Sequence, residues 1–207
     1  MKTWERSWKS EVLDYIKLGK MYEPKPEDFV LLLAYLDGKS PIYGDEVLHF
    51  IVAIYPYVEV SLSPSFFLPF SAEVERTLKN LLDRKLVART KQLYRGSERN
   101  IIKITEEGVD DARRLLKLFS DNWLLLRKTV VRPGLEVVNE LEALKKTYNG
   151  KSVSELMRVL ATKIGTEGAQ FISHLATGSD CGWVSYVYYL ARQISSEHAR
   201  TPISSWL

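Results

Sequence analysis

Residues 71–108, SAEVERTLKNLLDRKLVARTKQLYRGSERNIIKITEEG, decide the fold, because a helix, a basic hairpin and a second helix start follow one another here without a break. The apolar residues Val74, Leu78 and Leu81 recur at intervals of three and four, a spacing that predicts a helix with one buried stripe. Ser71 stands just before this helix, where its hydroxyl can accept from an unpaired amide of the first turn. The stretch therefore predicts a capped, half-buried helix that leads into a hairpin.

The hairpin is predicted by a change of period after Leu86. Two strand-like runs, 86–93 and 100–104, flank the turn residues 95–98. Thr105 then precedes two glutamates, which suits a helix N-terminus because a hydroxyl cap and negative charges are both favoured there. The order helix, hairpin, helix is thus predicted from local signals alone.

Basic residues are concentrated in this hairpin. Between Arg84 and Lys103 there are seven basic residues and one acid, Glu98, although the whole chain carries a net charge of only +3. Such a local excess of positive charge favours contact with phosphates. The candidate nucleic-acid-binding residues are Arg76, Lys79 and Asn80 on the helix, and Arg89, Lys91, Arg95, Arg99 and Lys103 on the hairpin. The alternative is that the basic hairpin is a solvated sheet edge kept from pairing with other strands.

The residues before Ser71 predict two helices and a loop. After Pro24 and Pro26, the apolar run 29–36 predicts a helix that is buried on most sides and ends at 37–39. A second helix is expected over about 44–55, and an aromatic, proline-rich loop with short extended pieces over 57–70. Helix, helix, loop, helix and hairpin is the element order of a winged helix. We therefore predict a mainly α protein with a small β-hairpin wing (α+β).

Further helices are predicted after the hairpin. One long helix is expected over 106–129, another over 135–148, a third from the capping box of Ser152 and Glu155 to about 164, and a last one over 183–194. Because the long helix needs another element or a second subunit to cover its apolar stripe, we expect a homodimer. The expected interface residues are Trp4, Trp8, Leu116, Phe119 and Trp123. The expected organisation is an N-terminal helix (1–22), a winged helix (23–108), a helical dimerisation region (109–194) and a flexible tail (195–207).

Residues 1–20 predict an amphipathic helix, with Trp4 and Trp8 on its apolar face and basic residues among the other positions. We expect it to pack on the domain or on a second subunit. The alternative is a basic amphipathic helix on a membrane surface, although three acids dilute its charge.

Composition predicts a cytoplasmic protein. The single cysteine, Cys181, excludes an internal disulfide, the chain does not open on a signal-peptide pattern, and the apolar runs are far shorter than the ~20 residues that span a bilayer. Charged residues make up 27% of the chain while only three glutamines and five asparagines occur, a balance that favours a thermophilic source.

Residues 28–108 resemble the winged-helix half of the YwgA-type proteins and, more distantly, the phage-associated, antitoxin-like Panacea proteins. The matching pieces are DFVLLLAYLDGKSPIYG, FLPFSAEVERTLKNLLDRKLV and IIKITEEG, and LEALKKTYNGKSVSELMRVL looks like the helical tail of the same group. The start ITEEG is also similar to that of MarR and PadR regulators. The resemblance implies a winged helix, with basic residues expected after Gly44, where this chain has Asp45, Glu46 and His49 instead. Some of these relatives act by binding protein.

Residues for catalysis are scattered. His49, His174 and His198 are far apart, Cys181 lies in no metal-binding spacing, and no glycine-rich phosphate loop occurs. Ser173, His174 and Asp180 could be imagined as a catalytic set, but nothing in the sequence brings them together. We predict that the chain is not an enzyme and holds no cofactor or metal.

Three functions follow from the pattern. The first is a dimeric regulator that contacts the backbone of double-stranded DNA through a basic wing, with the helix 106–129 or the N-terminal helix as the dimer seam. The second is a winged helix that binds a protein partner through Trp4, Trp8 and the aromatic loop 57–70. A role on RNA is the third.

Overall fold

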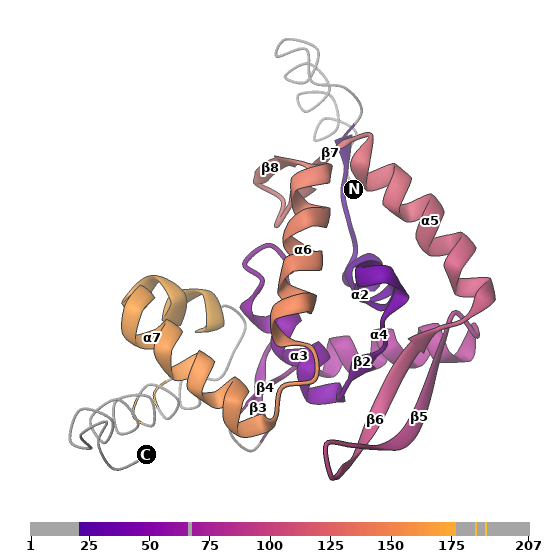
Figure 1. Cartoon of the computed structure of the whole chain (residues 1–207). Helices are drawn as coiled ribbons and strands as arrows, with labels where there is room; N and C mark the ends of the chain where they lie inside the picture. The colour runs from indigo at the N-terminus through magenta and orange to yellow at the C-terminus, as the bar shows by residue number, and fades with distance from the viewer. Residues whose placement is uncertain (1–20, 66–67, 177–184, 186–188, 190–207) are drawn as a thin grey trace.

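The protein is an α+β fold, as expected. The computed structural model describes residues 21–65 and 68–176 and the isolated positions 185 and 189 (Figure 1). In chain order the elements are β1 (Met21–Tyr22), α2 (Pro26–Lys39), β2 (Ile42–Tyr43), α3 (Asp45–Ile54), β3 (Ser63–Ser65), β4 (Leu68–Phe70), α4 (Ala72–Asp83), β5 (Val87–Tyr94), β6 (Ser97–Ile104), α5 (Glu106–Ser120), β7 (Trp123–Leu126), β8 (Val130–Pro133), α6 (Gly134–Tyr148) and α7 (Val153–Ala176). Trp4, Trp8, Cys181 and His198 lie outside the described residues, as does nearly all of the helix expected over 183–194.

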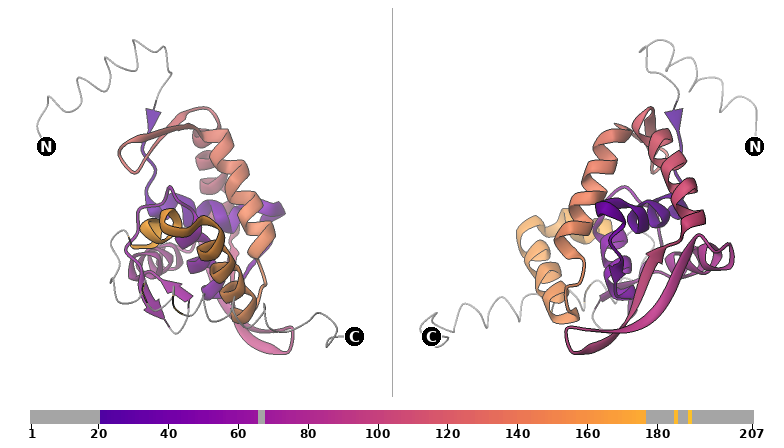
Figure 2. Two further views of the ribbon diagram at one scale, coloured as in Figure 1. Left: turned by 90° about the vertical axis from the view of Figure 1, so that its left-hand side faces the viewer. Right: turned by 45° about the vertical axis from the view of Figure 1, so that its right-hand side comes forward.

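Helix α2 lies at the centre of the fold. Its residues from Phe29 to Ala34 are all buried, which confirms the prediction of a helix covered on most sides. Helices α4, α5 and α6 all pack on it, and α5 and α6 form two sides of a wedge that closes at the β7–β8 hairpin (Figures 1 and 2). One hydrophobic core therefore runs across the domain boundary that the sequence suggested near residue 108.

The β5–β6 hairpin, which is the predicted wing, belongs to a three-stranded antiparallel sheet in the order β2-β6-β5. The two long strands pair from Val87 with Ile104 to Tyr94 with Ser97. Arg95 and Gly96, both with positive φ, form a two-residue turn that matches the twist of the strands. The hairpin is thus longer and its turn tighter than the sequence suggested, and the short strand β2 had no signal of its own.

The expected long helix over 106–129 is wrong. Helix α5 ends at Ser120, and the chain forms the hairpin β7–β8, with β1 added in parallel beside β7. The run from Trp123 to Leu126 is apolar at four successive positions, which suits a strand covered on both faces better than one helical stripe. Gly134, which opens α6, permits this course, because a Cβ there would collide with the Phe119 carbonyl.

The residues expected to form the dimer interface on this helix lie in different surroundings from those predicted. Phe119 is fully buried inside the chain, where its ring packs against Tyr22 and Phe29, so its side chain is not available to a second subunit. Leu116 is half-buried and packs against the same core, and Trp123 is a half-buried strand residue paired with Met21. The homodimer stays a prediction.

Three predicted helix starts are confirmed by their caps. The Ser71 hydroxyl accepts from the Val74 amide at 3.3 Å, and the Thr105 hydroxyl accepts from the Gly108 amide at 3.0 Å. At α7 the Glu155 carboxylate accepts from the Ser152 amide at 2.7 Å, while the Ser152 hydroxyl accepts from the Glu155 amide at 3.3 Å. The helix expected to end at about 164 continues to Ala176 as α7, with a kink at Gly168, whose φ is 58°.

Lys145 is the buried polar group that joins α6 to α2. It lies in the helix predicted over 135–148 and has no exposed surface. Its ammonium group donates to the Leu36 carbonyl at 2.8 Å and the Ser40 carbonyl at 2.6 Å. These are carbonyls at the C-terminal end of α2, where helical hydrogen bonds stop and three successive residues have positive φ. Lys145 therefore caps the central helix from a neighbouring one.

Replacing Lys145 by Met is expected to lower the free energy of unfolding by about 2 kcal/mol at pH 7, because the buried Leu36 carbonyl loses a charge-assisted partner. Chemical denaturation measures the change. Lys146→Met is the matched control, since Lys146 is exposed and forms a surface ion pair with Glu142. It should shift stability by less than about 0.5 kcal/mol. Equal effects of the two variants would contradict the assigned role.

Lys145 should also give stability a distinct pH dependence. Burial lowers its pKa from 10.5 to about 8, with Asp37 opposing the shift. Between these two values the unfolded chain binds the proton and the folded chain does not, so the contribution of Lys145 to stability increases from pH 8 to 10.5, by up to about 3 kcal/mol. The difference in unfolding free energy between the native chain and Lys145→Met should widen over this range. A constant difference would show that the lysine titrates normally.

Candidate nucleic-acid interface

The two faces of the wing carry different side chains. Residues two apart in a strand share a face, so Arg89 and Lys91 point to one side together with Asn100, and Arg99 points to the other side together with Tyr94. The first face meets α3 and α4, and the second meets the turn between α6 and α7. The base of the wing is therefore held on both sides.

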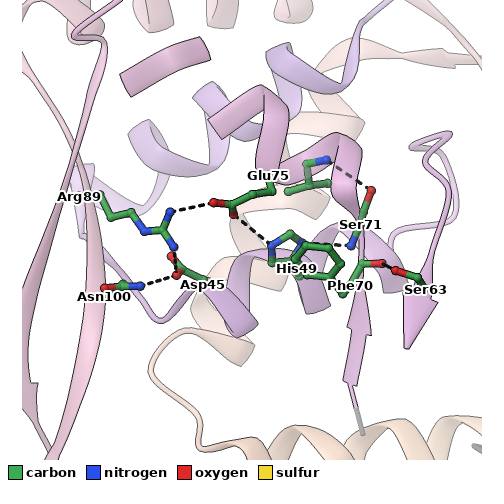
Figure 3. A network of polar contacts seen from close by, with 9 residues as sticks. Asp45, His49, Ser63, Phe70, Ser71, Glu75, Arg89 and Asn100 are labelled. Atoms are coloured by element: carbon green, nitrogen blue, oxygen red, sulfur yellow. Dashed lines mark hydrogen bonds and ion pairs between the residues drawn. The ribbon is translucent and has the colours of Figure 1, made fainter. Parts of the chain in front are cut away.

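Arg89 is the centre of a polar network under the first face (Figure 3). Its guanidinium group donates to Glu75 of α4 at 2.9 Å and forms an ion pair with Asp45 of α3. Asn100 of β6 donates to the same Asp45 oxygen at 2.5 Å. Burial alone would lower the pKa of Arg89, but its bonds to Glu75 and Asp45 raise that pKa above its ordinary value. Arg89 thus stays charged and joins the wing to both helices.

His49 extends this network into the core. The ring is 4% exposed; its Nδ1 accepts from the backbone amide of Ser71 at 3.3 Å, and its Nε2 lies 3.7 Å from Glu75. The Phe70 ring packs against it with centroids 4.6 Å apart. The sequence suggested an ordinary surface or core residue, and the structure places it in the core. His49 fixes the residue that caps α4.

Arg99 holds the opposite face of the wing. Only 12% of its side chain is exposed; it donates to the Lys151 carbonyl at 2.9 Å, lies 3.5 Å from Glu46, and stacks near the Tyr94 ring. Tyr94 in turn stacks on Tyr43 of β2 at 4.3 Å. Arg99 therefore serves mainly to fix the wing against the α6–α7 turn.

The other six predicted residues are exposed. Arg76, Lys79 and Asn80 lie on the solvent side of α4, and Lys91, Arg95 and Lys103 on the wing. Lys91 is 3.7 Å from Glu98 in a pair that is solvated on both sides, and Arg95 lies over the Tyr94 ring. Lys91 is on the face that turns toward α4. The structure thus divides the predicted set into two arginines that hold the wing and six polar side chains that solvent reaches.

The acidic residues Asp45, Glu46 and Glu75 have internal roles. Asp45 and Glu75 pair with Arg89, and Glu46 lies beside Arg99. Asp45 and Glu46 are therefore partners of arginines in the wing. The family resemblance leads one to expect basic residues at these positions. Sequence reasoning could not assign these pairs, because their members are separated by 14 to 53 residues along the chain.

Comparisons with known proteins found no matching family model, curated protein or solved structure. None of the described helices combines the length and apolar character that crossing a membrane requires. Within residues 21–65 and 68–176 no cluster of His, Cys, Asp and Glu is suited to a metal ion.

Arg89→Gln is expected to destabilise the fold by about 2 kcal/mol, because it leaves the carboxylates of Asp45 and Glu75 beneath the wing without their cation. Asp45 is the more affected of the two, since its Oδ1 atom is buried and has no hydrogen-bond partner among the described residues. Thermal or chemical denaturation measures the loss. Adding Asp45→Asn should restore part of it in a double-mutant cycle. Lys91→Gln, on the same strand face but exposed, is the control and should be near neutral; full additivity of the cycle would contradict the network.

Proposed function

We propose that this chain is a winged-helix protein that binds double-stranded DNA, with α4 as the helix that faces the DNA and the β5–β6 hairpin as its wing. The succession of α2, β2 and α3, the short β3–β4 hairpin, α4 and the β5–β6 hairpin supports this assignment, as does the sheet order β2-β6-β5, since a winged helix has three helices followed by a hairpin. Its third helix is the usual recognition element. In this chain that helix is α4, which presents two cations and an asparagine to solvent.

The observation that carries the proposal is the distribution of paired and unpaired charge. Arg89 offsets one of the two negative charges of Asp45 and Glu75, so this pair of carboxylates repels a phosphate backbone less than it would without the arginine. Arg76, Lys79 and Arg95 are exposed, and none of the three forms an ion pair with another of the described residues. Glu73 and Asp83 also lie on α4, and their negative charges repel phosphates. We therefore expect the cations of α4 to contact phosphates individually, without close contact along the whole helix.

Asn80 adds a group that can read a base. An asparagine amide can pair with adenine in the major groove, whereas Arg76 and Lys79 can contact guanine or phosphate. Regulation of transcription by a homodimer remains part of the proposal. In a dimer, two copies of α4 about 34 Å apart would meet successive major grooves on one side of the duplex.

Protein binding through the aromatic loop is the weaker candidate. Its residues Val58, Val60, Leu62 and Leu68 are all buried in the core, so much of this loop fills the interior and is not presented to a partner. The other half of that hypothesis, Trp4 and Trp8, lies outside the described residues.

A fluorescence titration of duplex DNA tests the proposal. We expect the affinity of the native protein to fall as the salt concentration rises. The double variant Arg76→Ala, Lys79→Ala should bind about tenfold more weakly at about 0.1 M salt, and its slope of log K against log salt should be smaller by about 2. Lys91→Ala with Arg95→Ala should act in the same direction. Asn80→Ala should relax sequence preference more than affinity.

The matched control is Lys146→Ala with Arg158→Ala, which removes the same charge from exposed positions on α6 and α7. It should leave the salt slope within error of the native value. Binding that is absent, flat in salt, or equally weakened by the control pair would refute the proposal.

A further inference from the structure

His49 lies where the capped end of α4 and the wing network meet. On one side its ring touches the Ser71 amide, and on the other it faces Glu75, which binds Arg89 of the wing. Ser71 is itself 1% exposed and caps α4 through its hydroxyl. One imidazole thus contacts both the residue that starts α4 and the carboxylate that ties α4 to the wing (Figure 3).

The hydrogen bonds define the protonation state of this ring. Because the Ser71 amide donates to Nδ1, that nitrogen must be unprotonated, so the neutral ring carries its proton on Nε2, toward Glu75. A second proton would have to go to Nδ1, where it would face the Ser71 N–H group. Protonation therefore removes the acceptor of a buried amide at the N-cap of α4.

We propose that His49 is a positioning residue for DNA binding, whose neutral form holds α4 and the wing in the arrangement that DNA selects, so that acidification weakens binding. This inference rests on the proposed function. It also predicts the opposite of the general trend, because acidification adds positive charge and ordinarily strengthens binding to a polyanion.

Charged groups on three elements act on the ring. Glu75 from α4 and Asp45 from α3 favour the protonated form, Arg89 from β5 opposes it, and the Phe70 ring from β4 excludes water on one side. Burial outweighs the carboxylates and lowers the pKa of His49 below its ordinary value of 6.5. The neutral form of His49 is thus the one present at pH 7, and we expect the ring to become protonated below pH 6.5.

The test measures duplex affinity at constant ionic strength from pH 7.5 to 5.0. A shift of one unit in the pKa of His49 between the free and bound protein corresponds to a tenfold change in affinity, so we expect binding about tenfold weaker at pH 5.0. His49→Gln cannot titrate and should follow the general trend. Native affinity that is unchanged or stronger at pH 5.0, or a parallel pH profile in His49→Gln, would overturn the inference.

A second measurement keeps the inference testable if the variant folds poorly or if no DNA is bound. The amide resonances of Ser71 and Val74 in the native protein should titrate together with the His49 ring. The Gly108 amide is the matched control, because it has the same kind of cap, from Thr105, in a helix start that contains no histidine. Absence of DNA binding at every pH refutes the proposed function, whereas a Ser71 amide that is insensitive to His49 titration refutes the positioning role.

Discussion

The burial of α2 is the constraint on which the rest of the structure depends. A helix that is apolar on nearly every side is stable in water only when other elements cover it, and here α4, α5 and α6 do so. This requirement merges the elements from α2 to β6 and the following helices into one core. It also buries the Leu36 carbonyl near the end of α2, which explains why a lysine side chain is buried beside it.

The proposed interface obeys the same rule at the surface. Arg89 and Arg99 are partly removed from water, and each lies beside carboxylates or carbonyls that compensate for the loss of hydration. These contacts fix the wing on both faces, so α3, α4 and the hairpin behave as one unit. The cations on α4 and at the wing tip are exposed to solvent, which suits contact with a hydrated backbone of phosphates.

The polar network has a further consequence for how the charge pattern is interpreted. Counting bases and acids along residues 84–103 suggests a strongly positive hairpin, yet the acids that balance it come from α3 and α4. The effective positive surface is therefore smaller than the sequence suggests, and it is displaced from the base of the wing to its tip and to α4. Glu75 and Asp45, whose negative charges lie beside the proposed interface, both pair with Arg89 within the fold.

The sequence by itself determined the local structure. Apolar spacing predicted the buried α2 and the half-buried α4, and the hydroxyl caps at Ser71, Thr105 and Ser152 marked helix starts correctly, because caps and periodicity depend on neighbours within a few residues. Only the tertiary structure decided the β7–β8 hairpin, the burial of Lys145, and the division of the basic residues into those that hold the wing and those that solvent reaches. Each of these depends on partners far away in the chain, such as Met21 beside Trp123 or Leu36 beside Lys145, and long-range pairing of this kind leaves no periodic signal in a single sequence.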